Sequence, residues 1–332
     1  MKKAIALLLL AILFSCTPKK EIKTIGSIER IDPSFDALVS ADASIEVIAE
    51  GFDWSEGPLW LEDQKMLIFS DVPKNTVYKW TEEKGHEVYL KPSGYTGNSS
   101  PYSDEEGSNG LTLSNEGKLV LCQHGDRRVS MMDAPLNDPK PTFVSLADNF
   151  QGKKLNSPND AVFNTAGNLF FTDPPYGLPN RMESPTKEIP FQGVYKASDG
   201  VVTLLTDSVS RPNGIAFFPG EKRLIVANSD PAKAVWYTFD LMENDSLTNA
   251  RIFYDATENT KTEKGLPDGL KVDKQGNVFA SGPGGVWIFD KDGKLLGKIK
   301  LPEATSNCSF SNDEKTLYIT VDMYVVRLKL RS

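Results

Sequence analysis

Histidine and cysteine are scarce in this 332-residue sequence, which has two histidines and three cysteines. Two histidines are too few for a histidine-rich zinc site. The three cysteines are Cys16, Cys122 and Cys308. A large core does not need disulfide bonds for its stability, so we expect a protein that does not depend on disulfides. A single pair between Cys122 and Cys308 is the alternative.

The motifs of several large enzyme classes are also absent. The sequence has no G-x-S-x-G nucleophile elbow and no G-x-x-x-x-G-K phosphate loop. A serine triad would have to use His86 or His124, because the chain has no other histidine. No long amphipathic helical pattern interrupts the sequence, and this absence favours an all-β fold.

Basic residues are outnumbered, and the formal net charge is −8. An acidic protein repels phosphate backbones and anionic lipid headgroups, so nucleic acid is not an expected partner. The hydrophobic fraction of 39% and the charged fraction of 25% are those of a folded protein. A chain of this length can bury a large core, as one large domain or two ordinary ones.

The first twenty residues, "MKKAIALLLLAILFSCTPKK", have the pattern of a secretory signal. Two lysines precede an apolar run, Ala4 to Phe14, that is too short to span a bilayer alone. Its end, "LFSC", is typical of a bacterial lipoprotein signal, with Cys16 acylated; an ordinary signal peptide with an incidental cysteine is the alternative. We therefore expect a signal peptide over residues 1–15 and a polar tether over 16–42. The protein would be exported and lipid-anchored to a bilayer of the cell envelope, facing the periplasm or on the outer membrane.

Six similar segments organise the remainder of the chain. Each contains a polar Glu, Asn or Asp, an alternating apolar run, a turn such as "NEGK", "TAGN" or "KQGN", and a second apolar run. The six polar positions, here called the marked residues, are Glu56, Asn109, Asn159, Asn213, Asp268 and Asn307. They are 39 to 55 residues apart, and hairpins repeating at this period are typical of propeller blades. We predict an all-β fold over 43–332: a six-bladed β-propeller with four-stranded blades around a central channel, closed by residues 44–52 as the outer strand of the last blade.

The marked residues would converge, because the innermost strand of each propeller blade begins near the channel. Glu56, Asn159, Asn213 and Asp268 then offer two carboxylates and two amide carbonyls. Oxygen ligands of this kind suit a hard cation such as Ca²⁺ or Mg²⁺. The alternative is that Asn and Asp before glycine simply form turns.

Several short motifs together resemble the gluconolactonase family, which also contains regucalcin, the senescence-marker protein. They are "SEGPLW", "CQHGDRRV", "NSPNDAVF", "TDPPYGL", "RPNGIAF", "LPDGLKVD" and "TSNCSF". The resemblance runs from about Ile45 to Leu330. It implies a six-bladed propeller with one divalent cation in the channel, expected to be Ca²⁺, with Mg²⁺, Mn²⁺ or Zn²⁺ as alternatives.

The same resemblance implies a set of site residues. Glu56, Asn213 and Asp268 would be metal ligands, and Asn159 would lie at the metal or contact substrate. The implied activity is the opening of sugar-type lactones: the metal polarises the lactone carbonyl, and Asp268 acts as general base or holds the attacking water. The alternatives are a non-catalytic binding or scaffold propeller with a structural cation, and a hydrolase of other esters or phosphotriesters. A monomer is expected.

Four residues are weaker candidates for substrate contacts. Asn109 is expected to line the channel, while His124 and Tyr176 stand where loops would reach its mouth. Lys154 would meet hydroxyls or a carboxylate product. Packing within a loop is the alternative for His124, and a solvated surface position is the alternative for Lys154. The long polar segments 95–107 and 179–190 would either gate the channel or decorate the surface.

The lipid anchor is directly testable. We expect mass spectrometry of the mature protein to find an acylated Cys16 as its first residue, because "LFSC" follows a short apolar run. A mature chain that starts unmodified elsewhere, or a Cys16→Ser variant that still partitions into detergent, would contradict this prediction.

Overall fold

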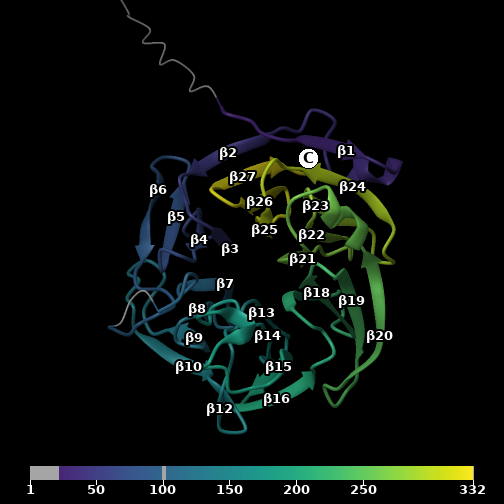
Figure 1. The fold of residues 1–332 in the computed structure, drawn as a ribbon. Coiled ribbons are helices and arrows are strands. Elements are labelled where there is room, and N and C mark those ends of the chain that lie inside the picture. Colours follow the sequence, from purple (N-terminus) through teal and green to yellow (C-terminus); the bar gives the residue numbers. More distant parts are fainter. Residues whose placement is uncertain (1–21, 99–101, 332) are drawn as a thin grey trace, which may run out of the picture.

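The computed structural model describes residues 22–98 and 102–331. Six β-sheets stand around a central axis like the blades of a propeller (Figure 1). The predicted fold is therefore confirmed. The predicted signal peptide and Cys16 lie outside the described residues, and both stay predictions. In the described ranges, no helix is long and apolar enough to cross a membrane.

Each blade contains four antiparallel strands, of which the innermost lies nearest the axis, and blade five has one further strand at its outer edge. Blades one to three contain β3 (Ser55–Leu61), β4 (Met66–Asp71), β5 (Thr76–Thr81), β6 (Gly85–Leu90); β7 (Ser108–Leu113), β8 (Leu119–Gln123), β9 (Arg128–Met132), β10 (Phe143–Ala147); β13 (Ala161–Phe163), β14 (Leu169–Asp173), β15 (Gly193–Ser198) and β16 (Val201–Thr206). A short ribbon, β11 (Asn149–Phe150) with β12 (Lys153–Lys154), precedes blade three.

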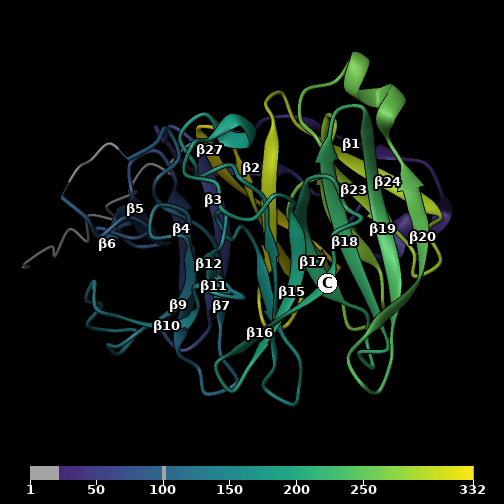
Figure 2. The same cartoon turned by 60° about the horizontal axis from the view of Figure 1, so that its bottom comes forward.

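Blades four and five contain β17 (Pro212–Phe217), β18 (Arg223–Asp230), β19 (Lys233–Leu241), β20 (Leu247–Asp255); β21 (Leu270–Val272), β22 (Val278–Gly282), β23 (Gly285–Phe289) and β24 (Leu295–Lys300). Blade six contains β25 (Thr305–Phe310), β26 (Thr316–Val321), β27 (Tyr324–Lys329) and β2 (Ile45–Glu50). Three short 3₁₀ helices, η1 (Pro33–Ala37), η2 (Arg181–Glu183) and η3 (Thr257–Lys261), complete the elements. Figure 2 shows the strands of blade four side by side.

Glycine turns join the first two strands of several blades, as the sequence predicts. In "NEGK" and "TAGN", Gly117 and Gly167 adopt φ values of 76° and 84°, a region that glycine enters without a Cβ penalty. The Gly117 N–H donates to the Ser114 carbonyl over 2.8 Å. These turns hold the alternating runs in register, so one face of each sheet packs on the next blade.

The ring is closed by the pairing of the N-terminal strand β2 with the C-terminal strand β27. Their register runs from Ile45 opposite Leu328 to Glu50 opposite Tyr324. The predicted closing strand, 44–52, is thereby confirmed. Closure pairs the outer edge of the last blade with chain from the other terminus, which removes an exposed strand edge.

The structure differs from the expected free tether over residues 22–42. Strand β1 (Ser27–Arg30) pairs with β24 as a fifth strand of blade five. Phe35 is fully buried and packs, with Leu38 and Val39, in the core shared by blades five and six. These apolar side chains are isolated in a polar segment, so the sequence has no periodic pattern that would predict their burial. Burying them stabilises the docked segment.

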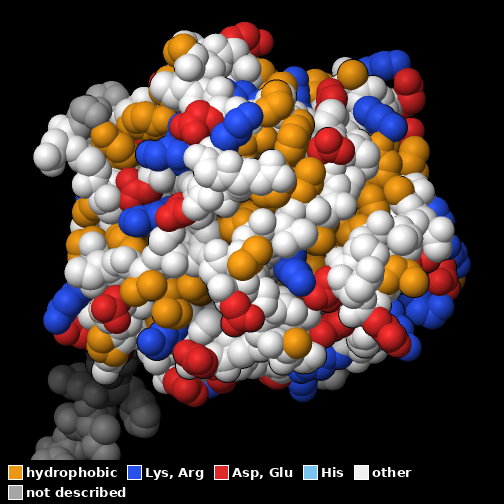
Figure 3. Space-filling model, turned by 90° about the horizontal axis from the view of Figure 1, so that it is seen from below, with side chains coloured by type: hydrophobic (Ala, Val, Ile, Leu, Met, Phe, Trp, Pro, Cys, Tyr) orange, Lys and Arg blue, Asp and Glu red, His pale blue; other side chains and the backbone are white. Residues whose placement is uncertain are grey.

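The core consists of apolar layers between neighbouring blades. Trp236 of blade four packs on Trp287 of blade five, with ring centroids 5.8 Å apart. Cys122 and Cys308 are both free and buried, which matches a fold independent of disulfides. On the side of the ring shown in Figure 3, acidic and basic side chains are interspersed rather than gathered by sign.

Candidate functional site

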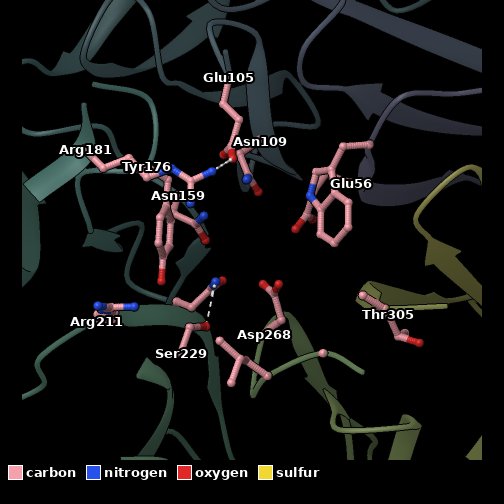
Figure 4. A pocket seen from close by; sticks show the side chains of 15 residues that line it. Glu56, Glu105, Asn109, Asn159, Tyr176, Arg181, Arg211, Ser229, Asp268 and Thr305 are labelled. Atoms are coloured by element: carbon pink, nitrogen blue, oxygen red, sulfur yellow. Dashed lines mark hydrogen bonds and ion pairs between the residues drawn. The ribbon is translucent and has the colours of Figure 1, made fainter. Parts of the chain in front are cut away.

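Five of the six marked residues line one cavity at the axis, as the repeat predicts. Its volume is about 370 Å³, and the marked residues on its wall are Glu56, Asn109, Asn159, Asn213 and Asp268. Their polar groups point toward one another, as Figure 4 shows for the labelled side chains. The sixth, Asn307, is buried and lies off the cavity wall, against Glu56.

The glycines after the marked residues allow the inner strands to touch. A Cβ on Gly57 would lie 2.3 Å from the Asn109 carbonyl oxygen, and one on Gly214 would lie 2.3 Å from that of Asp268. The Asn213–Gly214 pair lies inside strand β17. At that position the Asn–Gly motif therefore serves close approach between blades rather than a turn.

Glu56 is a buried carboxylate that accepts two hydrogen bonds at one of its two oxygens. Its Oε2 accepts the Gly57 N–H over 2.8 Å and the Asn307 amide over 3.4 Å. Burial raises the pKa of Glu56, and the nearby charge of Asp160 raises it further. Figure 4 shows the Glu56 carboxylate facing Asp268 across the cavity.

Asp268 is in a similar electrostatic position. Burial raises its pKa well above the ordinary value, and the charges of Glu56 and Asp160 add to the rise. Two carboxylates that face the same cavity repel each other, so an ionised pair is stabilised by a counter-charge.

Three buried oxygens on the cavity wall lack a hydrogen-bond donor. They are the Oδ1 atoms of Asn109, Asn159 and Asp268. The Asn213 side chain donates from Nδ2 to Ser229 Oγ over 3.0 Å. Its side-chain oxygen, Oδ1, is the atom that would coordinate a cation. Buried oxygens without partners are costly, and a divalent cation would satisfy them together. The donor set therefore fits a hard cation.

The set relies on amides as well as acids. In the part of the chain that the structure describes, no three His, Cys, Asp or Glu side chains gather in a way that would hold a metal ion. Only Glu56 and Asp268 supply carboxylates to the predicted site. Its remaining donors, Asn159 and Asn213, are neutral.

The weaker candidates divide into two groups. Asn109 and Tyr176 line the cavity. Lys154 is exposed on the β11–β12 ribbon, where its backbone N–H donates to Glu188 Oε2 over 2.8 Å, and it lies away from the cavity wall. His124 is fully buried, with Nδ1 3.2 Å from the Glu105 carbonyl oxygen.

His124 therefore supports the site without lining it. A Cβ on Gly177 would lie 2.3 Å from the His124 Cβ, so the loop after Tyr176 packs directly on the histidine. On its other side, His124 contacts the backbone of Glu105, which does line the cavity.

Sequence reasoning missed the charged residues at the cavity rim. Arg181 Nη2 lies 2.7 Å from Glu105 Oε1, and this ion pair joins the two long segments 95–107 and 179–190 at the cavity. Arg211 also lines the cavity, and its positive charge lies close enough to Asp230 to favour the ionised form of that carboxylate. Arg211 stands two residues before Asn213, in "RPNG", and this position next to a marked residue could have indicated that it lines the cavity.

Fold and site together define a six-bladed propeller with an oxygen-lined cavity at its axis. Residues 54–322 match the family described as the SMP-30/Gluconolactonase/LRE-like region, and the chain belongs to this family. The resemblance carried by the short motifs is thereby confirmed.

Two relatives extend this likeness over almost the whole chain. A gluconolactonase of Zymomonas mobilis subsp. mobilis is 40% identical over 316 residues, covering 93% of this chain and 87% of that protein. A solved gluconolactonase structure from Xanthomonas campestris has a TM-score of 0.79 at 29% identity, covering 95% of this chain and 99% of that one.

A third comparison concerns the fold alone. The crystal structure of a calcium-binding protein, regucalcin, from Agrobacterium tumefaciens has a TM-score of 0.65 at 18% identity. It covers 86% of this chain and 94% of that one.

His124 makes stability depend on pH. Burial lowers its pKa from 6.5 to about 4, so the unfolded chain binds a proton below pH 6.5 while the folded chain resists it until about pH 4. The free energy of unfolding should fall by about 2 kcal/mol from pH 7 to pH 5 through this group. In urea titrations at both pH values, His124→Gln should lose that part of the decrease.

The matched control is His86→Gln, which changes the other, exposed histidine. His86→Gln should keep the wild-type decrease between pH 7 and pH 5. An equal decrease in His124→Gln and wild type would contradict the neutral, buried state of His124.

Proposed function

We propose that this protein is a gluconolactonase-like enzyme that opens sugar-type lactones with the help of one divalent cation. The cation that we propose is Ca²⁺. The observation that carries the proposal is the group of buried oxygens without donors, from Asn109, Asn159 and Asp268, beside Glu56 in one cavity. Family membership and the 40% identical gluconolactonase support the activity. The calcium-binding description of regucalcin supports the choice of ion.

Glu56, Asn159, Asn213 and Asp268 would hold the cation. When bound, it would polarise the lactone carbonyl and balance the two carboxylates. Asp268 takes the proton of the attacking water at a carboxylate oxygen. Water adds to the carbonyl carbon, the ring ester bond breaks, and the proton passes to the departing alcohol oxygen, leaving a hydroxy acid.

The rim residues would bind and orient the substrate. Arg211 lines the cavity and can donate to sugar hydroxyls and to the carboxylate of the product. The Tyr176 ring and the Asn109 amide line the same cavity. The Glu105–Arg181 ion pair joins the two segments that border the entrance.

The activity and its metal dependence are tested together. Glucono-1,5-lactone should be hydrolysed above its uncatalysed rate, chelator should abolish the enzymatic part, and added Ca²⁺ should restore it. Turnover that chelator does not affect would contradict the metal role. Binding of lactone and Ca²⁺ without turnover would instead identify a ligand-binding propeller.

Asp268→Asn separates coordination from proton transfer. The amide keeps an oxygen donor of the same size but loses the basic site, so at saturating Ca²⁺ kcat should fall about 10²- to 10⁴-fold. Asn213→Ala is the ligand-only control, whose activity should recover as Ca²⁺ is raised. Full recovery of Asp268→Asn with excess Ca²⁺ would assign Asp268 to coordination alone, and Glu105 would be the remaining cavity carboxylate to consider as base.

A further inference from the structure

Lys271 is a positive charge that acts on two buried acids near the axis, Glu56 and Asp160. It belongs to β21, three residues after Asp268. Its Nζ donates to the Leu270 carbonyl oxygen over 3.0 Å and to Asn307 Oδ1 over 3.3 Å. Lys271 is half-buried and does not line the cavity, so it is not placed to touch a substrate.

One amide connects Lys271 to Glu56. Asn307 accepts from Lys271 at Oδ1 and donates from Nδ2 to Glu56 Oε2 over 3.4 Å. The amide has little freedom to turn, because Oδ1 also accepts the Cys308 N–H over 2.9 Å. A Cβ on Gly269 would lie 1.9 Å from the Asn307 Cγ, so the amide also packs tightly on that glycine.

A third carboxylate shares this region of the channel. Asp160 is 3% exposed, and its Oδ1 accepts the Ala161 N–H over 2.9 Å. Its Oδ2 has no hydrogen-bond partner. Burial raises the pKa of both Asp160 and Glu56, and in both the charge of Lys271 opposes the rise.

Three acids here, Glu56, Asp160 and Asp268, form no ion pair among the described residues, whereas the fourth, Glu105, is paired with Arg181. A buried carboxylate without a counter-charge is strongly destabilising. Lys271 can supply part of that counter-charge from a fixed position, whereas a divalent cation supplies it only when bound. A bound cation and the Lys271 ammonium would repel each other.

We propose that Lys271 is a built-in counter-charge of the channel, which stabilises the cation-free propeller and limits how tightly the site binds a divalent cation. This inference rests on the cation of the proposed function, and it concerns a residue outside the ligand set. Lys271 acts through Asn307 and through space, and is therefore a positioning and tuning residue.

Replacing Lys271 by a neutral residue of similar length tests the proposal. Calorimetry should give Lys271→Met a Ca²⁺ Kd roughly tenfold lower than that of the wild type, because one repelling charge is removed. Its melting temperature in chelator should fall, and Ca²⁺ should raise it by more than it raises the wild type. Lys271→Arg, which keeps the charge, should resemble the wild type in both measurements.

Two further variants complete the design. Lys271→Gln is also neutral and can still donate to Asn307, so it should show the same tighter Ca²⁺ binding if Lys271→Met does not fold. Lys274→Met removes an exposed lysine from the same blade and should leave the Ca²⁺ Kd unchanged. These readouts do not depend on catalysis, so failure to hydrolyse lactone would overturn the proposed activity without touching this inference.

Unchanged or weaker Ca²⁺ binding in the neutral variants would overturn the proposal. So would a loss of melting temperature that is equal with and without Ca²⁺, since that would show only a packing role for Lys271.

Discussion

Contact between the six inner strands around the axis is the constraint on which the rest of this structure depends. Backbone groups and a serine hydroxyl link neighbouring blades: the Gly269 N–H donates to the Ser306 carbonyl over 2.7 Å, and Ser306 Oγ donates to the Ser55 carbonyl over 2.6 Å. The last of these bonds joins blade six to blade one, and it is in place because β2 pairs with β27 and closes the ring. If the ring were not closed, Glu56 and Asp268 would lie farther apart and the cavity between them would not form.

Close contact has an electrostatic consequence. The inner strands bring Glu56, Asp160 and Asp268 together near the axis, where burial raises the pKa of all three acids. The same convergence leaves amide oxygens of Asn109 and Asn159 without donors. Such an arrangement is unfavourable for stability alone and is typical of a functional site. A cation at this point, as proposed, would use both the negative charge and the unpartnered oxygens.

The rim of the cavity follows a different logic from its floor. The marked residues that line the cavity sit on the inner strands or within two residues before them, whereas Glu105 and Arg181 sit in long connections between strands. Their ion pair links two segments that are 76 residues apart along the chain. Substrate choice in this family fold can therefore vary through the loops while the oxygen donors stay in place.

The sequence by itself determined the number of blades, the hairpins and the marked residues that line the cavity, because period-two alternation and glycine turns are local signals. The short motifs also identified the family, since each of them is a contiguous run of a few residues. Tertiary structure alone decided which polar residues share the low-dielectric channel. Asp160 and Lys271 join the site through blade contacts that span more than a hundred residues, and the buried state of His124 depends on the packing of Gly177. The same holds for Phe35, whose burial between blades five and six turns a polar-looking N-terminal segment into part of the fold. How deeply a side chain is buried and how far apart two blades lie determine these contacts and the protonation of the acids. Neither the depth of burial nor the distance between blades can be read from a short stretch of sequence.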